Sequence, residues 1–500
     1  MPEGPRGRPE RQRLRALREL DAEQHRLRPA YKLWGYTNPF AKGWLLTRGS
    51  AEPPVDRWAS TSVGPWRLLL DPELELRRAD AGDVTVVILG QAFDDRGPQG
   101  RDRIARRLLR AATLPDASRS RQQVDEAVVW LSGRFVVIVR HGERLDVHGD
   151  PLASRSVYWH RGPDGVQLGS HSALLAEAVG GLPSAQARWA LLHPDHAAPF
   201  GRWLPGLITE HDGVGQLFAN GALAVDGASV EHRRCFPLSD RVELPVADAA
   251  EAFRAELAQQ VRNWASIAPT TVLALTAGVD SRAVLEAGLI DLRRARALAL
   301  TYHPFHQPAK STRSDLEVAS RLAAAAGLRH LTLDVRPLSA DGPMHRLHAR
   351  TFPVWRRYAA LAGALYVGAP ARAATIFGVG GAIVTGMTKE RSDRTLSPGL
   401  LARKFAGSAF GDDPVLHEAM AAWMARTGFS EPAMRGHDFY DLFHWEHRMS
   451  KWAATGYAEY DLATIPAPVL SSRRLLLAAL AVPEQARFDG AIYRAIGARG

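Results

Sequence analysis

Short apolar runs separated by turn residues dominate the chain from residue 44 to about 237. Runs of this length and spacing are typical of β-strands. A polar, glycine-containing turn separates the runs 133–140 and 145–148, which predicts a hairpin. Helices are predicted over 102–112 and 122–130. This half is therefore expected to be α+β with an antiparallel sheet, whose further strands are predicted over 66–70, 84–89, 134–140, 167–169 and 222–225.

The pattern changes after Pro237. Apolar residues at helical spacing predict an amphipathic helix over 247–264. Strands and helices then alternate, which predicts a parallel, doubly wound α/β sheet. Its strands are expected over 271–276, 297–302, 330–335 and 374–378, and its helices over 281–289 and 315–325. The predicted organisation is a basic arm over 1–28, helical over 13–24, a first domain over 29–240 and a second over 241–500.

Composition narrows the class of protein. The 500 residues exceed what one hydrophobic core usually supports. No apolar run reaches the roughly 18 residues of a membrane span. The single cysteine, Cys235, argues against a disulfide framework, and the basic start of the chain lacks the apolar core of a signal peptide, so a cytoplasmic location is expected. The net charge of +10 is spread along the chain, and nucleic-acid binding is not expected.

The segment 271–282 carries the clearest candidate chemistry, because an apolar strand runs into a turn of small residues. Backbone N–H groups of such a turn can close on an anion, and the following helix directs its positive end to the same point. The turn lacks the features of a Walker A loop and of a dinucleotide fingerprint. Asp280 is the predicted Mg²⁺ ligand. The residues predicted to bind phosphate here are Leu275, Thr276, Ala277, Gly278, Val279, Asp280 and Ser281.

The turn 276–281 resembles the Ser-Gly-Gly-x-Asp-Ser pyrophosphate loop of the N-type ATP pyrophosphatases. Thr276 replaces the serine and Ala277 replaces a glycine. The segments 133–135, 149–159, 204–206 and 234–237 are similar to the glutaminase-like domain of the asparagine synthetase group. The resemblance covers about residues 40–495.

The resemblance implies an antiparallel, glutaminase-like (Ntn-type) domain before an ATP pyrophosphatase domain. It also implies an activity that uses ATP and Mg²⁺. A substrate carboxylate would attack the α-phosphorus of ATP, and an amine would then displace AMP to form an amide. In the family the second strand leads to the adenosine end of ATP, which makes Thr301 and Tyr302 candidate nucleotide contacts. His303 and His306 follow, and a loop lining the nucleotide pocket is favoured over a zinc site because a third ligand at suitable spacing is missing.

Three departures from the family pattern matter. The chain begins Met1-Pro2 and lacks the nucleophilic cysteine of the glutamine-using members, so glutaminase activity is expected to be absent. The amine would then come from the substrate, as in β-lactam synthetases and lasso peptide cyclases. Val379 replaces the tyrosine that β-lactam synthetases use, which counts against β-lactam formation.

The second phosphate-side motif reads Gly-Val-Gly-Gly-Ala-Ile over 378–383 and has lost its acidic pair. Gly378 and Gly380 remain candidate nucleotide contacts. Ala382 stands where the family has a metal-binding aspartate, so Mg²⁺ would depend on Asp280, ATP oxygens and water, or on Glu390 or Asp393.

The lysine that the family carries near its C-terminus is also absent from the matching segment 488–494. Lys389, Lys451 or Arg494 would supply its charge, or adenylation is weakened or lost. Glu446, in the segment 440–452, is the best available general base for the amine. The alternative is an amphipathic helix on which Glu446 faces solvent or forms a structural ion pair.

The leading hypothesis is an amide-forming ligase that joins a carboxylate to an amine of a peptide or small metabolite, with macrolactam closure of a lasso peptide as its first version. A leader-peptide-binding protein or protease would then be a partner. The alternatives are an amide ligase acting on a small specialised metabolite and a catalytically degenerate nucleotide-binding partner protein. Sulfur transfer to tRNA is disfavoured because it generally needs reactive cysteines.

Overall fold

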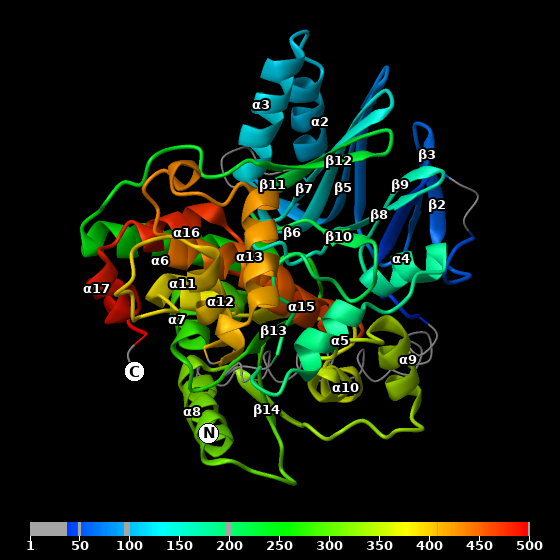
Figure 1. Ribbon diagram of the computed structural model, residues 1–500. Coiled ribbons are helices and arrows are strands. Elements are labelled where there is room, and N and C mark those ends of the chain that lie inside the picture. The colour runs from blue at the N-terminus through cyan, green and yellow to red at the C-terminus, as the bar shows by residue number, and fades with distance from the viewer. Residues whose placement is uncertain (1–37, 49–51, 95–100, 197–201, 408, 499–500) are drawn as a thin grey trace, which may run out of the picture.

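The computed structural model describes residues 38–48, 52–94, 101–196, 202–407 and 409–498 (Figure 1). The expected basic arm over 1–28 and its helix over 13–24 lie outside these ranges. Three sheets organise the described chain. The strands of two antiparallel sheets fall within 44–234, and those of a parallel sheet fall within 271–468. The domain boundary near residue 240 remains a prediction.

Two six-stranded antiparallel sheets pack face to face in the N-terminal half. The first has the order β10 (Val214–Gln216), β8 (Tyr158–Gly162), β9 (Gly165–Gly169), β1 (Trp44–Thr47), β3 (Trp66–Leu70) and β2 (Ala59–Val63). The second has the order β12 (Ser229–Arg234), β11 (Gly221–Asp226), β7 (Arg144–Gly149), β6 (Ser132–His141), β5 (Val84–Phe93) and β4 (Leu76–Ala81).

Alternation of side chains along each strand builds the core between these sheets. Leu68 and Leu70 of β3 meet Val87 and Leu89 of β5 in one buried cluster. The intervening residues of β5 and β6 point to the opposite face of the second sheet. There they pack under α2 (Arg101–Ala112) and α3 (Ala117–Val129), which cover that face at the top of Figure 1. The central strands β5 and β6 are therefore buried on both sides, whereas the edge strands β4 and β12 are partly exposed.

The parallel sheet has the order β15 (Arg329–Asp334), β14 (Leu298–His303), β13 (Thr271–Ala274), β16 (Ala374–Phe377) and β17 (Ile465–Pro468). The chain leaves β13 toward β14 on one side and later returns to β16 on the other. The order therefore reverses between β13 and β16. Open α/β sheets bind their ligands outside the carboxyl ends of the strands at such a reversal.

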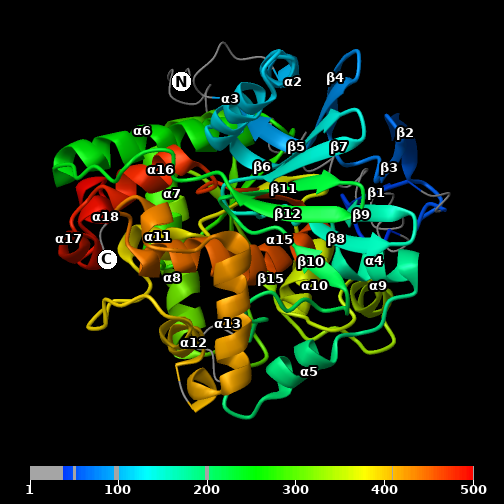
Figure 2. The ribbon, with the colours of Figure 1, turned by 45° about the horizontal axis from the view of Figure 1, so that its top comes forward.

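Helices complete the molecule (Figure 2). Those of the N-terminal half that follow α3 are α4 (Ser172–Val179) and α5 (Ala185–Leu192). Those around the parallel sheet are α6 (Val246–Ala265), α7 (Val279–Arg294), α8 (Lys310–Ala326), α9 (Pro343–Thr351), α10 (Ala359–Gly368), α11 (Gly381–Thr385), α12 (Pro398–Ala406), α13 (Pro414–Thr427), α14 (Phe439–Phe443), α15 (Ala454–Asp461), α16 (Arg473–Leu480), α17 (Glu484–Phe488) and α18 (Ala491–Ala495). The described chain also contains two 3₁₀ turns, η1 (Ala409–Asp412) and η2 (Pro432–Met434). It contains one π-helical segment, η3 (His444–Ala453).

The structure confirms the mixed α/β fold with antiparallel sheets followed by a parallel sheet, and each predicted strand and helix within the described residues is present. Some boundaries of helices differ from the predicted ones, because a capping residue sets where the helix begins. Helix α3 begins five residues before its predicted start because Asp116 accepts a hydrogen bond of 2.6 Å from the N–H of Arg119. Strand β17 was missed because its sequence, Ile-Pro-Ala-Pro, reads as a loop, yet prolines are tolerated at the edge of a sheet.

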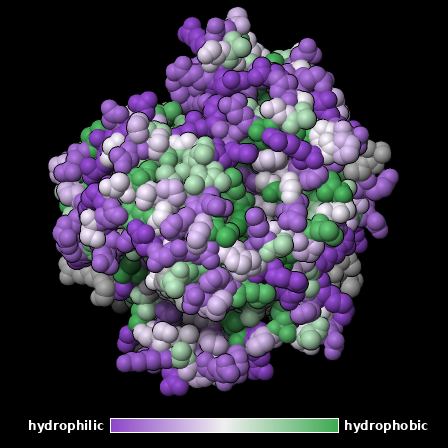
Figure 3. All heavy atoms as spheres, in the orientation of Figure 1, coloured by the Kyte–Doolittle hydropathy of each residue, from purple (hydrophilic) through white to green (hydrophobic). Residues whose placement is uncertain are grey.

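The surface seen in Figure 3 is mainly hydrophilic, with hydrophobic side chains in small scattered groups. In the part of the chain that the structure describes, none of the helices is both long and apolar enough to cross a membrane.

A buried ion pair connects β6 to the end of α15. The guanidinium of Arg134 donates to both carboxylate oxygens of Asp461 at 2.7 Å. We expect Asp461→Asn to lower the free energy of unfolding by about 3–5 kcal/mol, because Arg134 would stay buried without a counter-charge. Urea denaturation at pH 7 measures the change. The exposed pair Arg48–Glu143 is the control, and Glu143→Gln should cost less than about 1 kcal/mol. An equal loss of unfolding free energy in the two variants would show that burial does not strengthen the Arg134–Asp461 ion pair.

Candidate functional site

The predicted phosphate turn connects β13 to α7, but its N–H groups are partly engaged. The N–H of Ala277 donates to the Asp315 carboxylate at 2.8 Å, and the N–H of Gly278 donates to Thr276 Oγ1 at 3.0 Å. The prediction that these two groups form an open anion cradle is therefore wrong for this conformation. The sequence could not reveal it, because Asp315 lies 38 residues further along the chain.

The first turn of α7 provides the remaining donors. This helix begins at Val279, and the first N–H groups of an α-helix have no partner within the helix. Its 16 residues direct the positive end of the helix dipole toward the turn. Ser281 holds the turn closed, because its Oγ accepts from the N–H of Thr276 at 3.1 Å. The N–H groups left for an anion are thus those of the helix N-terminus rather than of the whole turn.

The second glycine-rich loop packs directly against Asp280. A Cβ atom built on Gly381 would lie 2.0 Å from Asp280 Oδ1, and one built on Gly378 would lie 3.2 Å from Asp280 Cβ. Gly380 has a φ of +111°, which side-chain-bearing residues rarely adopt. These glycines are needed because the aspartate approaches the loop backbone so closely.

The environment of Asp280 suits a single metal contact. Burial raises the pKa of Asp280 to about 6, and the neighbouring Tyr493 hydroxyl opposes that rise. The carboxylate is therefore mostly ionised at pH 7. Mg²⁺ is commonly held by one or two carboxylates together with phosphate oxygens and water, which this residue fits. Among the described residues, no group of three or more His, Cys, Asp and Glu side chains could hold a metal ion.

A cavity of about 330 Å³ lies at the carboxyl ends of β13 and β16. Pockets of this size upward accommodate small-molecule ligands. The turn before α7, the loop after β16 and one face of η3 form its walls. The candidate nucleotide contacts that line it are Thr276, Gly278, Asp280, Ser281, Tyr302, Gly378 and Gly380.

The other candidate nucleotide contacts, Leu275, Ala277, Val279 and Thr301, are not among the lining residues. Thr301 supports the turn from β14, because its hydroxyl donates to Leu275 O at 2.7 Å and contacts His330 Nε2 at 2.8 Å. Glu390 and Asp393, the alternative metal ligands, do not line the cavity either. Among the residues that the structure describes, Asp280 is thus the only carboxylate in the wall.

The segment η3 has two faces with different surroundings: one lines the cavity, and the other contacts the N-terminal half. Its i→i+5 hydrogen bonding gives a wider turn than an α-helix has, and such segments are frequent at functional sites. His444, Arg448, Met449 and Trp452 line the cavity on one face. Side chains from outside satisfy carbonyl groups of the segment, because Gln216 Nε2 donates to Ser450 O at 2.7 Å.

Glu446 lies on the other face and does not line the cavity. Its carboxylate accepts two hydrogen bonds from Arg234, at 2.8 and 2.6 Å, and one from Asn220 Nδ2 at 3.2 Å. The side chain is 1% exposed. The expectation that Glu446 is the general base is corrected accordingly, since this carboxylate forms a structural ion pair with the N-terminal half.

The lysine substitutes are also positioned away from the cavity. Lys451 Nζ donates to Ile208 O at 2.7 Å within the contact between the two halves, and Lys389 Nζ donates to Phe488 O at 3.0 Å on the surface. Arg494 bonds to Asp489 O. These positions do not support the predicted catalytic roles of Lys389 and Lys451. Within the described chain, Arg448 is the only lysine or arginine that lines the cavity.

Sequence reasoning missed Arg448, although it lies in the segment singled out for Glu446. The available signal was the recurrence of His444, Arg448 and Trp452 at intervals of four residues, which places them on one helical face. His303, by contrast, is buried against Phe305 with ring centroids 4.4 Å apart, and it is not among the residues of the cavity wall.

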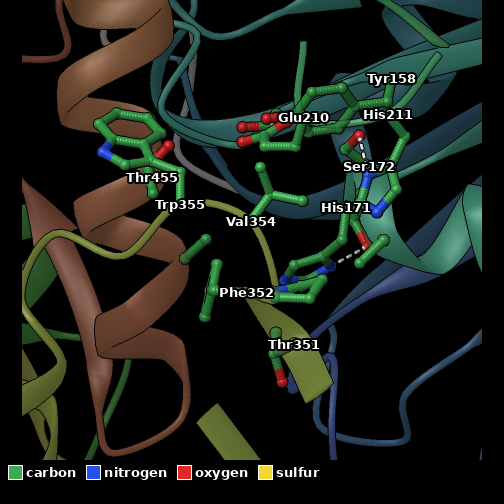
Figure 4. A pocket seen from close by; sticks show the side chains of 15 residues that line it. Tyr158, His171, Ser172, Glu210, His211, Thr351, Phe352, Val354, Trp355 and Thr455 are labelled. Carbon is green, nitrogen blue, oxygen red and sulfur yellow. Dashed lines mark hydrogen bonds between the residues drawn. The ribbon is translucent and has the colours of Figure 1, made fainter. Parts of the chain in front are cut away.

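A second, smaller cavity lies between the two halves (Figure 4). Ser172 Oγ and His211 Nδ1 are 2.8 Å apart there, as are Ser170 Oγ and His171 Nδ1. Its volume of about 20 Å³ leaves room for about one water molecule. This cavity is therefore too small for a nucleotide, and the larger one is the candidate site.

Comparisons with known proteins give limited support. No family model matches the chain. One curated protein, the carboxyethyl-arginine β-lactam synthase of Streptomyces clavuligerus, is 29% identical over 159 residues, which cover 31% of this chain and 28% of that protein. The similarity agrees loosely with the resemblance to the asparagine synthetase group. It says nothing of lasso peptide cyclases, and this chain matches less than a third of the relative's length.

Two solved structures align with the fold only weakly. A glutamine phosphoribosylpyrophosphate amidotransferase from B. subtilis, complexed with ADP and GMP, has a TM-score of 0.22 at 10% identity, covering 78% of this chain and 75% of that one. An allosteric regulatory enzyme of purine biosynthesis has a TM-score of 0.24 at 10% identity, with 78% and 76% covered. Scores this low carry no argument, so the Ntn-type assignment of the first domain remains a prediction.

The burial of Lys451 predicts a pH-dependent stability. Burial lowers the pKa of Lys451 to about 7, whereas a lysine in an unfolded chain titrates near 10.4. Between these values the unfolded chain binds more protons, so the stability of the protein rises with pH. Below pH 7 both states are protonated, and the cost of burying the charge is complete.

We therefore expect Lys451→Met to stabilise the protein most near pH 7, with the gain falling as the pH approaches 10. Urea denaturation at pH 7, 8, 9 and 10 measures this difference. The control is Lys310→Met on the exposed surface of α8, whose effect should not vary with pH. A gain for Lys451→Met that is constant with pH would show that the lysine is not buried as a neutral group.

Proposed function

We propose that this protein is an ATP-dependent amide-forming ligase. It activates a substrate carboxylate as an acyl-adenylate, releases pyrophosphate, and couples the acyl group to an amine without using glutamine. The observation that carries the proposal is the meeting of a helix N-terminus, a glycine-cradled aspartate and a buried arginine in one cavity at the reversal point of a parallel sheet.

Each wall has a part in this reaction. The first turn of α7 stabilises negative charge on the departing pyrophosphate through its N–H groups and its dipole. Asp280 holds Mg²⁺, which when bound neutralises phosphate charge. The glycines after β16 keep the aspartate in place.

His444 is the candidate contact for the amine. Burial lowers the pKa of His444 to about 3, so the imidazole is neutral at pH 7. Its Nε2 atom is buried and has no hydrogen-bond partner among the described residues. A neutral imidazole can accept a hydrogen bond from an incoming amine and orient it. With so low a pKa, His444 positions the amine rather than removing its proton.

The finer version of the proposal is macrolactam closure of a lasso peptide, with a leader-peptide-binding or protease partner in a cytoplasmic setting. An amide ligase acting on a small specialised metabolite is the alternative within the same chemistry. The similarity to a β-lactam synthase supports amide-bond formation in general and favours neither version.

A catalytically degenerate nucleotide-binding protein is the second candidate. It is favoured by the internal Asp315 carboxylate on the Ala277 N–H, and by the fact that Asp280 is the one acid in the cavity wall within the described ranges. In that case nucleotide binds, but pyrophosphate is not released in the presence of any carboxylate.

The exchange of labelled pyrophosphate into ATP decides between the two. We expect Asp280→Ala to reduce carboxylate-dependent exchange at least a hundredfold, because metal and phosphate lose their protein carboxylate. The control is Asp164→Ala in an exposed turn, which should leave exchange unchanged. Full activity in Asp280→Ala would remove this residue from the mechanism, whereas binding of ATP without any exchange in the unaltered protein would support the degenerate candidate.

Gly381→Ala tests the close approach of the second loop. The new Cβ atom would occupy the position of the Asp280 carboxylate, so we expect the affinity for Mg·ATP to fall at least tenfold while the fold persists. Isothermal titration calorimetry measures the affinity, and circular dichroism monitors the fold. In Gly162→Ala, the matched control, the nearest atom to the added Cβ lies 3.6 Å away, and ATP affinity should be unchanged. Unaltered affinity in Gly381→Ala would show that Asp280 does not contribute from this position.

A further inference from the structure

Of the described residues that line the cavity, one side chain is cationic and one is anionic. Asp280 lies between the two glycine-rich loops, and Arg448 comes from η3. The phosphate-binding elements, α7 and the loop after β16, belong to the side of Asp280. The positive charge of Arg448 therefore faces a part of the cavity that these loops do not form.

Two indole rings hold Arg448 in place. Its Cζ atom lies 4.4 Å from the ring centroid of Trp203 and 4.4 Å from that of Trp452. The in-plane N–H groups of a guanidinium match the two oxygens of a carboxylate, and its faces contact aromatic rings. The burial of Arg448 lowers its pKa to about 10, so the group is still protonated at pH 7.

A second cation strengthens the positive potential of this wall. Arg357 lies over Trp452, with its Cζ atom 3.0 Å from the ring centroid, and it also contacts Tyr358. The carboxylate of Glu459, which accepts from the backbone N–H groups of Arg357 and Tyr358, offsets part of this charge. Arg448 lines the cavity and Arg357 does not, so Arg448 is the cation that an anion in the cavity would meet.

Most neighbours of Arg448 along the cavity wall are apolar or aromatic, and the exception is His444, whose imidazole is neutral at pH 7. Met387, Met449, Phe377 and Trp452 line the space beside it. A ligand group next to the anion would therefore be apolar, since burying further charge there would cost free energy.

We propose that Arg448 recognises the carboxylate of the acyl donor, and that this donor carries an apolar or aromatic group beside its carboxylate. The proposal rests on the proposed function, because it names the substrate class of the same cavity. Arg448 binds and orients the carboxylate against the α-phosphorus of ATP, and the apolar wall holds the adjoining methylenes or ring. A Glu or Asp side chain presented by a peptide meets the same description through its methylene groups.

The test measures two ligands separately by calorimetry. The first is Mg²⁺ with the non-hydrolysable analogue α,β-methylene-ATP. The second is 3-phenylpropanoate, titrated into protein saturated with that analogue, with the neutral 3-phenylpropanamide as its isostere. The unaltered protein should bind the carboxylate at least tenfold more tightly than the amide. Arg448→Met should lose at least tenfold in affinity for the carboxylate, bind the amide as before, and keep its affinity for the nucleotide within twofold.

Arg426→Met is the matched control, because Arg426 also lies over an indole ring, that of Trp159, but is outside the cavity. It should change neither affinity. Arg448→Lys keeps the charge without the planar fork and should show an intermediate loss for the carboxylate. If Arg448→Met does not fold, two other results still test whether Arg448 binds the carboxylate. They are the affinity of Arg448→Lys and the preference of the unaltered protein for the carboxylate over the amide.

The outcomes separate the two proposals. Failure of the unaltered protein to bind the nucleotide would overturn the proposed function. Nucleotide binding with no preference for 3-phenylpropanoate over the amide would overturn the substrate class alone. A loss of nucleotide affinity in Arg448→Met would make Arg448 a phosphate ligand and would overturn its assignment to the carboxylate.

Discussion

The segment η3 is the element on which the rest of the candidate site depends. Glu446 and Arg448 are two residues apart on it and lie on opposite faces, so that Arg448 lines the cavity while Glu446 is buried away from it. The π-helical path sends one set of side chains into the cavity and the other into the N-terminal half. His447 Nε2 accepts from the N–H of Gly206 at 2.8 Å, and Ser450 Oγ accepts from the N–H of Ala219 at 2.9 Å. The site and the contact between the halves are therefore built on the same ten residues.

This arrangement gives the N-terminal half a structural purpose. Buried polar groups require partners, and the second face of η3 obtains them from segments around residues 206–234. Without those partners, Glu446 and Lys451 would be buried charges in need of compensation. The antiparallel sheets thus stabilise the cavity wall from outside, whether or not they carry chemistry of their own.

The sequence predicted what depends on local pattern. The strand, turn and helix around Asp280, the presence of a parallel sheet and the antiparallel first half all follow from periodicity and turn residues. The roles of Glu446 and Lys451 could not be predicted in this way. Their partners, Arg234 and Ile208, lie 212 and 243 residues away, and only the tertiary structure decides which face of a helix meets them. Arg448 differs, because its spacing of four residues from His444 and Trp452 was visible in the sequence, whereas the cavity that this face lines was not.

The absence of acidic side chains from the loop 378–383 is compatible with the position of Asp280. In that loop Gly381 approaches the carboxylate so closely that a side chain there would displace it. The chain therefore has a compact loop that encloses one aspartate, and the neutral Ala382 lines the cavity next to it.

The contact between Asp315 and the N–H of Ala277 changes how ligand affinity at this turn is to be understood. A phosphate that uses this donor exchanges one anion for another, because it first displaces an internal carboxylate. The measured free energy of binding is then a difference between two anion contacts rather than the gain from one. A phosphate and the Asp315 carboxylate therefore compete for the same N–H group. If a ligand displaces Asp315, ligand binding would also affect α8, the helix that carries Asp315.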